Sequence, residues 1–163
     1  MAKIVLPQKV LEKEAYSALA SSQKEEYIHN LLKDILELNR EGITASQLDE
    51  ATYLGHSTIW HHLEILASRA QCLKIGHGEG AFVYYSNKVI DDLKELDIQD
   101  KHYHYCFNII ENTYGKFVRL QIKQENKYGV FRTNCGVLIN QSFIADVMST
   151  LAKIKEQHLN NDE

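Results

Sequence analysis

The chain has 163 residues, of which 44% are hydrophobic and 25% are charged, as in an ordinary globular protein with one large or two small domains. It lacks a run of about 18 apolar residues and an N-terminal secretory signal, so we expect a cytoplasmic protein with no membrane partner. The formal net charge is −4 and the acidic excess is spread evenly, so composition alone does not indicate nucleic-acid binding.

Two helices are predicted at the start of the chain. Residues 7–20 suggest a short helix, in which Pro7 suits the first turn. A stronger helix is expected to open at Ser22, with Glu25 completing a capping box, and to end before Gly42. Its apolar stripe consists of Tyr27, Ile28, Leu31, Leu32, Ile35 and Leu36.

Residues 43–85 have the order helix, turn, helix, hairpin. Thr44 can cap a short helix with Gln47 at the capping-box position, and Gly55 is expected to end this helix with a tight turn. Helix 56–69 follows, with Ile59, His62, Leu63 and Leu66 on one face. Two short strands, CLKIG and AFVYY, flank a loop at 77–80. This order is typical of a winged helix-turn-helix.

The segment LGHSTIWHHLEIL resembles the recognition helix of small archaeal and bacterial winged-helix regulators of the ArsR type. The resemblance covers residues 24–86. It implies that helix 56–69 enters the major groove and that loop 77–80 lies near the DNA backbone or the minor groove. Two positions depart from the family pattern: Trp60 stands where a small residue is usual, and Gln71 replaces the usual glycine before the first wing strand.

Contacts to bases are expected from the polar side of helix 56–69. Hydroxyl groups can hydrogen-bond base edges, a threonine methyl can meet a thymine methyl, and an imidazole can donate to a purine acceptor. The candidate groove residues are Ser57, Thr58, Trp60 and His61. Lys74 and His77 could contact phosphates, although Glu79 opposes this. Two alternatives remain open: Trp60 packs under the wing, or the whole helix face binds a protein.

The chain is predicted to divide into a winged-helix DNA-binding domain at 1–97 and a dimerisation or regulatory domain at 98–163. Residues 87–97 are expected to form a short connecting helix. After them, HYCFNIIE, FVRLQIK, VFRTN and VLIN predict a four-strand antiparallel meander, with turns at 112–115 and 126–129. An amphipathic helix at 142–158 closes the chain, so the predicted fold class is α+β.

The segment FVRLQIK alternates strictly between apolar and polar positions. Val118, Leu120 and Ile122 are expected to face the core, and the intervening polar residues are expected to face solvent. The helix at 142–158 has too long an apolar stripe for a small sheet to cover alone. It is therefore expected to cover the sheet, to contact a second subunit, or to do both.

The order of strands and helix in residues 104–156 resembles the positive cofactor four family of single-strand-binding coactivators. The segment GVLIN running into helix 142–158 looks like the last strand and helix of that family. The resemblance implies phosphate contacts from Arg119, Lys123 and Arg132, and base stacking on Phe117 or Tyr128. A dimerisation or ligand-sensing module with an ordinary solvated face is the alternative.

His102, His104 and Cys106 share one face if they lie on a strand, and such a set can bind zinc. No fourth ligand occurs at a recognisable spacing, so we predict an ordinary surface strand with no metal and no cofactor. The chain also lacks a P-loop, a GxGxxG and an HExxH motif, so we do not expect an enzyme.

Together these patterns predict a sequence-specific transcriptional regulator that binds double-stranded DNA as a homodimer. Two further hypotheses stay open. The first is a single-stranded nucleic-acid-binding protein that uses the C-terminal sheet. The second is a protein-interaction adaptor of the transcription machinery.

Overall fold

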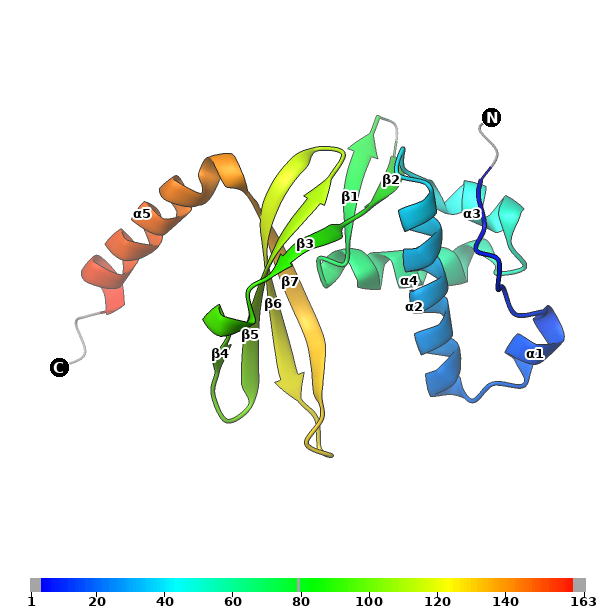
Figure 1. The fold of residues 1–163 in the computed structure, drawn as a ribbon, viewed down its shortest axis with the longest axis horizontal. Helices are drawn as coiled ribbons and strands as arrows, with labels where there is room; N and C mark the ends of the chain where they lie inside the picture. The colour runs from blue at the N-terminus through cyan, green and yellow to red at the C-terminus, as the bar shows by residue number, and fades with distance from the viewer. Residues whose placement is uncertain (1–3, 79, 160–163) are drawn as a thin grey trace.

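A computed structural model describes residues 4–78 and 80–159, and its combination of helices with antiparallel sheets confirms the α+β class (Figure 1). Helices α1–α4 lie with the first sheet at one end of an elongated molecule, and the second sheet occupies the middle. The helices are α1 (Lys13–Ser17), α2 (Ser21–Leu38), α3 (Ala45–Ala51), α4 (His56–Ser68) and α5 (Ile144–Ile154). Among the described residues, no helix is both long and apolar enough to cross a bilayer.

The starts of α2 and α3 are set by local hydrogen bonds. α2 begins one residue before the predicted Ser22, and Gln23 rather than Glu25 accepts the hydrogen bond from the Ala20 N–H, at 3.0 Å. α3 begins as predicted. The Thr44 hydroxyl oxygen accepts from the Gln47 N–H at 3.2 Å, and Gln47 Oε1 accepts from the Thr44 N–H at 2.9 Å.

The turn between α3 and α4 differs from the prediction. Thr52 closes α3 through its hydroxyl, which donates to the Leu48 carbonyl at 2.9 Å. Gly55 is the N-cap of α4 and has a φ of −70°, which any residue adopts. The predicted tight glycine turn at this position is therefore wrong.

The exit from α4 has the left-handed conformation that often ends a helix. Ala70 adopts it, with a φ of 54°, and the following Gln71 N–H donates to the Leu66 carbonyl at 2.8 Å. Gln71 therefore does not need the conformational freedom of the glycine that the winged-helix regulators carry there, because the residue before it makes the turn.

The first sheet is a hairpin that closes the core formed with α2, α3 and α4. Its strands are β1 (Cys72–His77) and β2 (Ala81–Ser86). Ile43 joins the end of α2 to this hairpin, because its N–H and carbonyl both bond to the backbone of Tyr84. Gly42 precedes it with a φ of 90°, and a Cβ there would lie 2.5 Å from the Tyr85 ring, so only glycine fits.

The second sheet is antiparallel and has the strand order β3-β5-β6-β7, with β4 also paired to β5. Its strands are β3 (Lys88–Asp92), β4 (Ile98–Gln99), β5 (Tyr103–Asn112), β6 (Gly115–Glu125) and β7 (Phe131–Asn140). The predicted helix at 87–97 is wrong, because this segment supplies β3 and a 3₁₀ turn at Lys94–Leu96. The second sheet thus begins inside the segment assigned to the first domain.

One residue, Asn87, separates the first sheet from the second. Its side chain is buried and donates to the Ala70 carbonyl at 3.2 Å, while its Oδ1 accepts from Asn112 at 3.0 Å. The amide therefore connects the end of α4 to the β5–β6 turn. This arrangement leaves no flexible linker between the two sheets.

The predicted strands VFRTN and VLIN form one continuous strand, β7, that passes through Gly136. A Cβ at Gly136 would lie 2.6 Å from the Arg69 carbonyl oxygen and 2.8 Å from the Ala70 Cβ. Glycine occupies this position because the strand approaches the end of α4 closely. It does not mark a break between two strands.

The polar face of the second sheet is the buried one. Gln121 and Arg119 are only 6% and 9% exposed, and Gln121 donates to the Arg69 carbonyl at 2.6 Å. On the opposite face, Val118, Leu120 and Ile122 are only half-buried. The predicted alternation along β6 is confirmed, but the assignment of its polar side to solvent and of its apolar side to the core is reversed.

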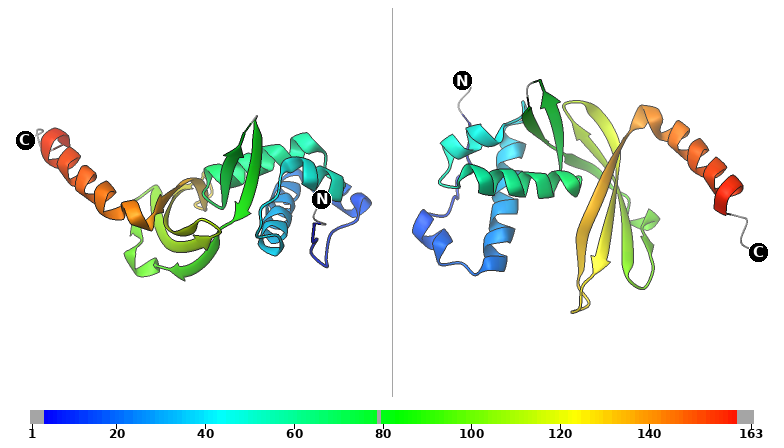
Figure 2. Two further views of the ribbon diagram at one scale, coloured as in Figure 1. Left: turned by 90° about the horizontal axis from the view of Figure 1, so that it is seen from above. Right: turned by 180° about the vertical axis from the view of Figure 1, so that it is seen from behind.

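The last helix is shorter than the predicted 142–158. A 3₁₀ turn, Gln141–Phe143, leads from β7 into α5, and one π-helical turn, Lys155–Leu159, follows it. The helix extends away from the sheet in all three views (Figures 1 and 2).

Candidate nucleic-acid interface

α4 has one fully buried face and one polar exposed face. Ile59, Leu63 and Leu66 are 0% exposed, since they pack into the core with α2 and α3. On the other side, Trp60 is 49% exposed. The predicted groove residues Ser57 and His61 are exposed beside it, and Thr58 is half-buried. The structure therefore brings all four onto the accessible side of the helix.

The N-terminus of α4 has backbone donors without a side-chain cap. Gly55 is the N-cap and has no side chain to accept from the first-turn N–H groups. These donors and the positive end of the helix dipole favour an anion. Ser57 and Thr58 lie in this same first turn, so the first turn of α4 could supply both phosphate and base contacts.

His29 of α2 and His62 of α4 form a pair behind the exposed face. His62 Nδ1 lies 3.0 Å from His29 Nε2, so one ring donates to the other and both cannot be protonated there. Burial, followed by the charge of His62, lowers the pKa of His29 to about 4, and burial also lowers the pKa of His62. His62 thus serves the packing of α4 and not the interface.

The histidine pair predicts a pH-dependent stability. The folded pKa of His29 lies below the unfolded value, so the unfolded chain binds more protons between about pH 4 and 6.5. Stability should be full above this window and fall by roughly 1–3 kcal/mol as the pH drops through it, because the buried His29 ring must then take up a proton. Urea unfolding across this range measures the slope. His29→Gln should remove most of it, whereas His102→Gln should not; an equal slope in both variants would contradict the assignment.

Lys74, a predicted phosphate contact, is already paired. Its Nζ lies 2.7 Å from Glu64 Oε1 and 3.8 Å from the centre of the Phe82 ring. Glu64 also accepts from the Tyr84 hydroxyl at 2.6 Å. Burial alone would raise the pKa of the Glu64 carboxyl, but these hydrogen bonds outweigh it and the pKa lies below its ordinary value. Lys74 therefore fixes β1 to α4, and most of its charge is neutralised.

His77 lies at the end of β1, where the hairpin loop begins, and is exposed. Its Nε2 is 3.2 Å from the Tyr85 hydroxyl, which is also 3.2 Å from the Tyr114 hydroxyl in the β5–β6 turn. Glu79, predicted to oppose phosphate contacts, lies outside the described residues.

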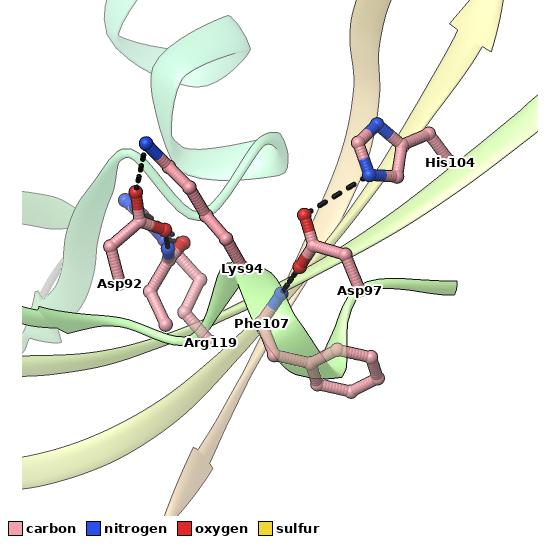
Figure 3. Close-up of polar contacts among 7 residues, drawn as sticks. Asp92, Lys94, Asp97, His104, Phe107 and Arg119 are labelled. Atoms are coloured by element: carbon pink, nitrogen blue, oxygen red, sulfur yellow. Dashed lines mark hydrogen bonds and ion pairs between the residues drawn. The ribbon is translucent and has the colours of Figure 1, made fainter. Parts of the chain in front are cut away.

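The basic residues predicted to hold single-stranded nucleic acid do not form one exposed surface. Arg119 donates through Nε and Nη2 to Asn108 Oδ1, at 3.1 and 2.8 Å. Asn108 in turn donates to Asp92, which lies 3.4 Å from Lys94 (Figure 3). Burial lowers the pKa of the Arg119 guanidinium. Arg119 is thus part of an internal polar network and is only 9% exposed.

The other members of that predicted set are dispersed. Phe117 and Lys123 are half-buried on β6, while Tyr128 is 76% exposed in the β6–β7 turn. Arg132 is exposed on β7 and shares a groove with Glu25 and Glu26 of α2. Lys33 of α2 and Arg69 line the same groove, so a phosphate approaching this arginine would meet charges of both signs.

Asp97, His104 and Cys106 come together on the polar face, with their ligand atoms within 4.8 Å of one another. Asp97 accepts from His104 Nε2 and from the Phe107 N–H, each at 3.0 Å (Figure 3). Both carboxylate oxygens thus have donors, and these bonds fix the 3₁₀ turn to β5. His102, the other predicted ligand, is not part of this cluster and lies 3.6 Å from Glu125.

Sequence reasoning missed the acidic partners of the basic residues. Glu64 neutralises Lys74 across ten positions of the chain, and Asp92 lies close to Arg119 through Asn108. Glu64 follows Trp60 by four residues and so lies on the same side of helix 56–69, which was an available signal for the first. No local signal existed for the second, because it depends on the pairing of β3 with β5. No family model, curated protein or solved structure matches this chain.

Proposed function

We propose that the chain is a winged helix-turn-helix protein that binds double-stranded DNA through α4 as a homodimeric, sequence-specific transcriptional regulator. The observation that carries this proposal is the division of α4. Its apolar side is fully buried, while Ser57, Trp60 and His61 are accessible beside an uncapped helix N-terminus. The hairpin β1–β2 lies next to this helix, where a wing would contact the DNA backbone. Binding and not catalysis is the proposed activity.

Duplex is favoured over single-stranded nucleic acid as the ligand. A single-strand platform on the second sheet would need accessible cations and aromatic rings together on one face. Arg119 is buried and bonded to Asn108, and Arg132 lines a groove of mixed charge together with acidic and basic residues of α2. An α-helix fits the major groove of duplex DNA, and α4 has an accessible polar face.

The second candidate function is a protein-interaction adaptor. Neutralisation of Lys74 by Glu64 and the net charge of −4 both leave few cations for phosphate contacts, which favours this candidate. An adaptor would present the same face of α4, with Trp60 as its anchor, to another protein. It would bind neither duplex nor single strands.

The test is selection of bound sequences from a random duplex pool, followed by variants of α4. His61→Ala should weaken binding to the selected site by roughly 1–3 kcal/mol and binding to random duplex by less. His102→Ala is the matched control, because that imidazole is exposed on the second half of the molecule. If no duplex is selected, or if His61→Ala and His102→Ala bind equally, the proposal fails and the adaptor is favoured.

A further inference from the structure

The second sheet has an uncovered apolar face. The strand register places Phe107, Leu120 and Val137 side by side, with Ile109, Val118 and Ile139 in the next row. This apolar sheet face consists of Tyr105, Phe107, Ile109, Val118, Leu120, Ile122, Val137 and Ile139. All eight side chains are half-buried or exposed, and Val137 is 53% exposed. On the opposite face, by contrast, Ile110 is fully buried.

α5 has an uncovered apolar stripe as well. The stripe consists of Phe143, Ile144, Val147, Met148, Leu151 and Ile154. Phe143, Met148 and Leu151 are 60%, 66% and 60% exposed, and no residue of α5 is buried. The helix has 11 residues, and a helix of this length is marginal in water unless its apolar side packs against something.

α5 is directed away from its own sheet by the turn that precedes it. Asn140 Oδ1 accepts from the Ser142 N–H at 3.0 Å and from the Ser142 hydroxyl at 2.8 Å. These bonds fix the chain where it leaves β7, and the helix then extends beyond the end of the sheet (Figure 2). To lie on its own apolar sheet face, α5 would have to reverse direction within this turn.

We infer that two copies of the chain exchange their last helices, so that the α5 stripe of each packs on the apolar sheet face of the other. One contact covers both surfaces, and a two-fold axis repeats it, which makes the interface closed and self-complementary. The dimensions agree: α5 is about 16 Å long, and the apolar positions of β6 from Val118 to Ile122 span four residue steps, about 13 Å. Apolar surfaces of this kind on a folded chain mark an interface. We assign a second copy of the chain to this contact because each chain carries one α5 stripe and one apolar sheet face, so two chains cover all four surfaces.

Sedimentation of the full chain, without DNA, tests this interface. The full chain should be a dimer, and Met148→Glu with Leu151→Glu should raise its dissociation constant by at least 100-fold. The matched control is Ser149→Glu with Lys153→Gln, which makes the same charge change of −2 on the opposite side of α5 and should leave the dimer intact. A monomeric full chain, or equal effects of the two pairs, would overturn the inference.

A mixing experiment separates helix exchange from a dimer in which the two helices contact only each other. Val137→Glu, on the apolar sheet face, should also give a monomer, and its circular dichroism should match that of the unaltered chain because the side chain is already exposed. This variant is then mixed with the Met148→Glu and Leu151→Glu variant. The first supplies an intact α5 and the second supplies an intact apolar sheet face, so one of the two contacts can form. A heterodimer should therefore form, with an affinity between those of the unaltered dimer and the separate variants. No heterodimer, or a dimeric Val137→Glu variant, would overturn the exchange.

This interface gives a structure to the homodimer of the proposed function, but its test does not depend on DNA binding. A dimer that fails to bind any duplex would contradict the proposed function alone. A monomer that still binds a selected duplex would contradict the interface and the homodimeric state, but not DNA binding through α4.

Discussion

Replacing Gly136 with alanine should lower the free energy of unfolding by about 1–3 kcal/mol, the range for overpacking a tight contact. The new methyl group would lie 2.6 Å from the Arg69 carbonyl oxygen, and neither strand β7 nor the end of α4 can yield without disturbing hydrogen bonds. The Gln121 bond to the same carbonyl would lengthen as the two halves separate. Urea unfolding followed by circular dichroism measures the loss.

Gly76→Ala is the control for this substitution. Gly76 also lies in a strand, but a Cβ there meets only the Phe82 ring at an ordinary distance of 3.6 Å. The free energy of unfolding of the Gly76→Ala variant should differ from that of the unaltered chain by less than about 0.5 kcal/mol, as at most surface positions. Equal stability of both variants would show that the close contact between β7 and the end of α4 does not hold the halves together.

Replacing Leu63 with alanine should lower the free energy of unfolding by about 2–5 kcal/mol, because it leaves a cavity in the core. Leu63 is 0% exposed and lies on the buried side of α4. His61→Ala, on the opposite side of the same helix, should change the free energy of unfolding by less than about 0.5 kcal/mol. Thermal and urea unfolding of the two variants test the division of α4 that the proposed interface requires. A large loss from His61→Ala would contradict that division.

Local patterns predicted the features that depend on neighbouring residues. The Thr44 cap follows from the Gln47 spacing, and the two-sided character of α4 follows from helical periodicity. The turns at 112–115 and 126–129 form where predicted. Gly115 and Gly129 adopt positive φ there, and Asn126 Oδ1 accepts two backbone N–H groups.

Features that depend on distant pairing could not be predicted. Lys88–Asp92 belongs to a segment with the charge spacing of a helix, but Val89 pairs with Ile110 in β5 and the segment becomes a strand. Gly136 suggested a break, whereas it marks the approach of β7 to the end of α4. In both cases, contacts between distant parts of the chain override the local preference.

Some features of the candidate site could likewise be predicted from the sequence, and others could not. Accessibility of Trp60 and His61 follows from the periodicity of α4, so the groove residues could be selected from sequence. The pairing of Lys74 and the burial of Arg119 could not be predicted, because the alternation of residues shows which side chains share a face but not what covers that face. The polar side of β6 is buried against a backbone carbonyl, and its apolar side is only half-buried.

The buried junction at Asn87 has a mechanical consequence. Only one residue separates the two sheets, and its side-chain amide is hydrogen-bonded to both halves. A rotation of the second sheet would therefore turn α4 with it, because there is no flexible hinge between them. In a dimer joined through the second sheet and α5, the distance and angle between the two α4 helices would thus be fixed before DNA binds. Selection among operators would then act on half-site spacing, since any other spacing would require the DNA itself to bend or twist.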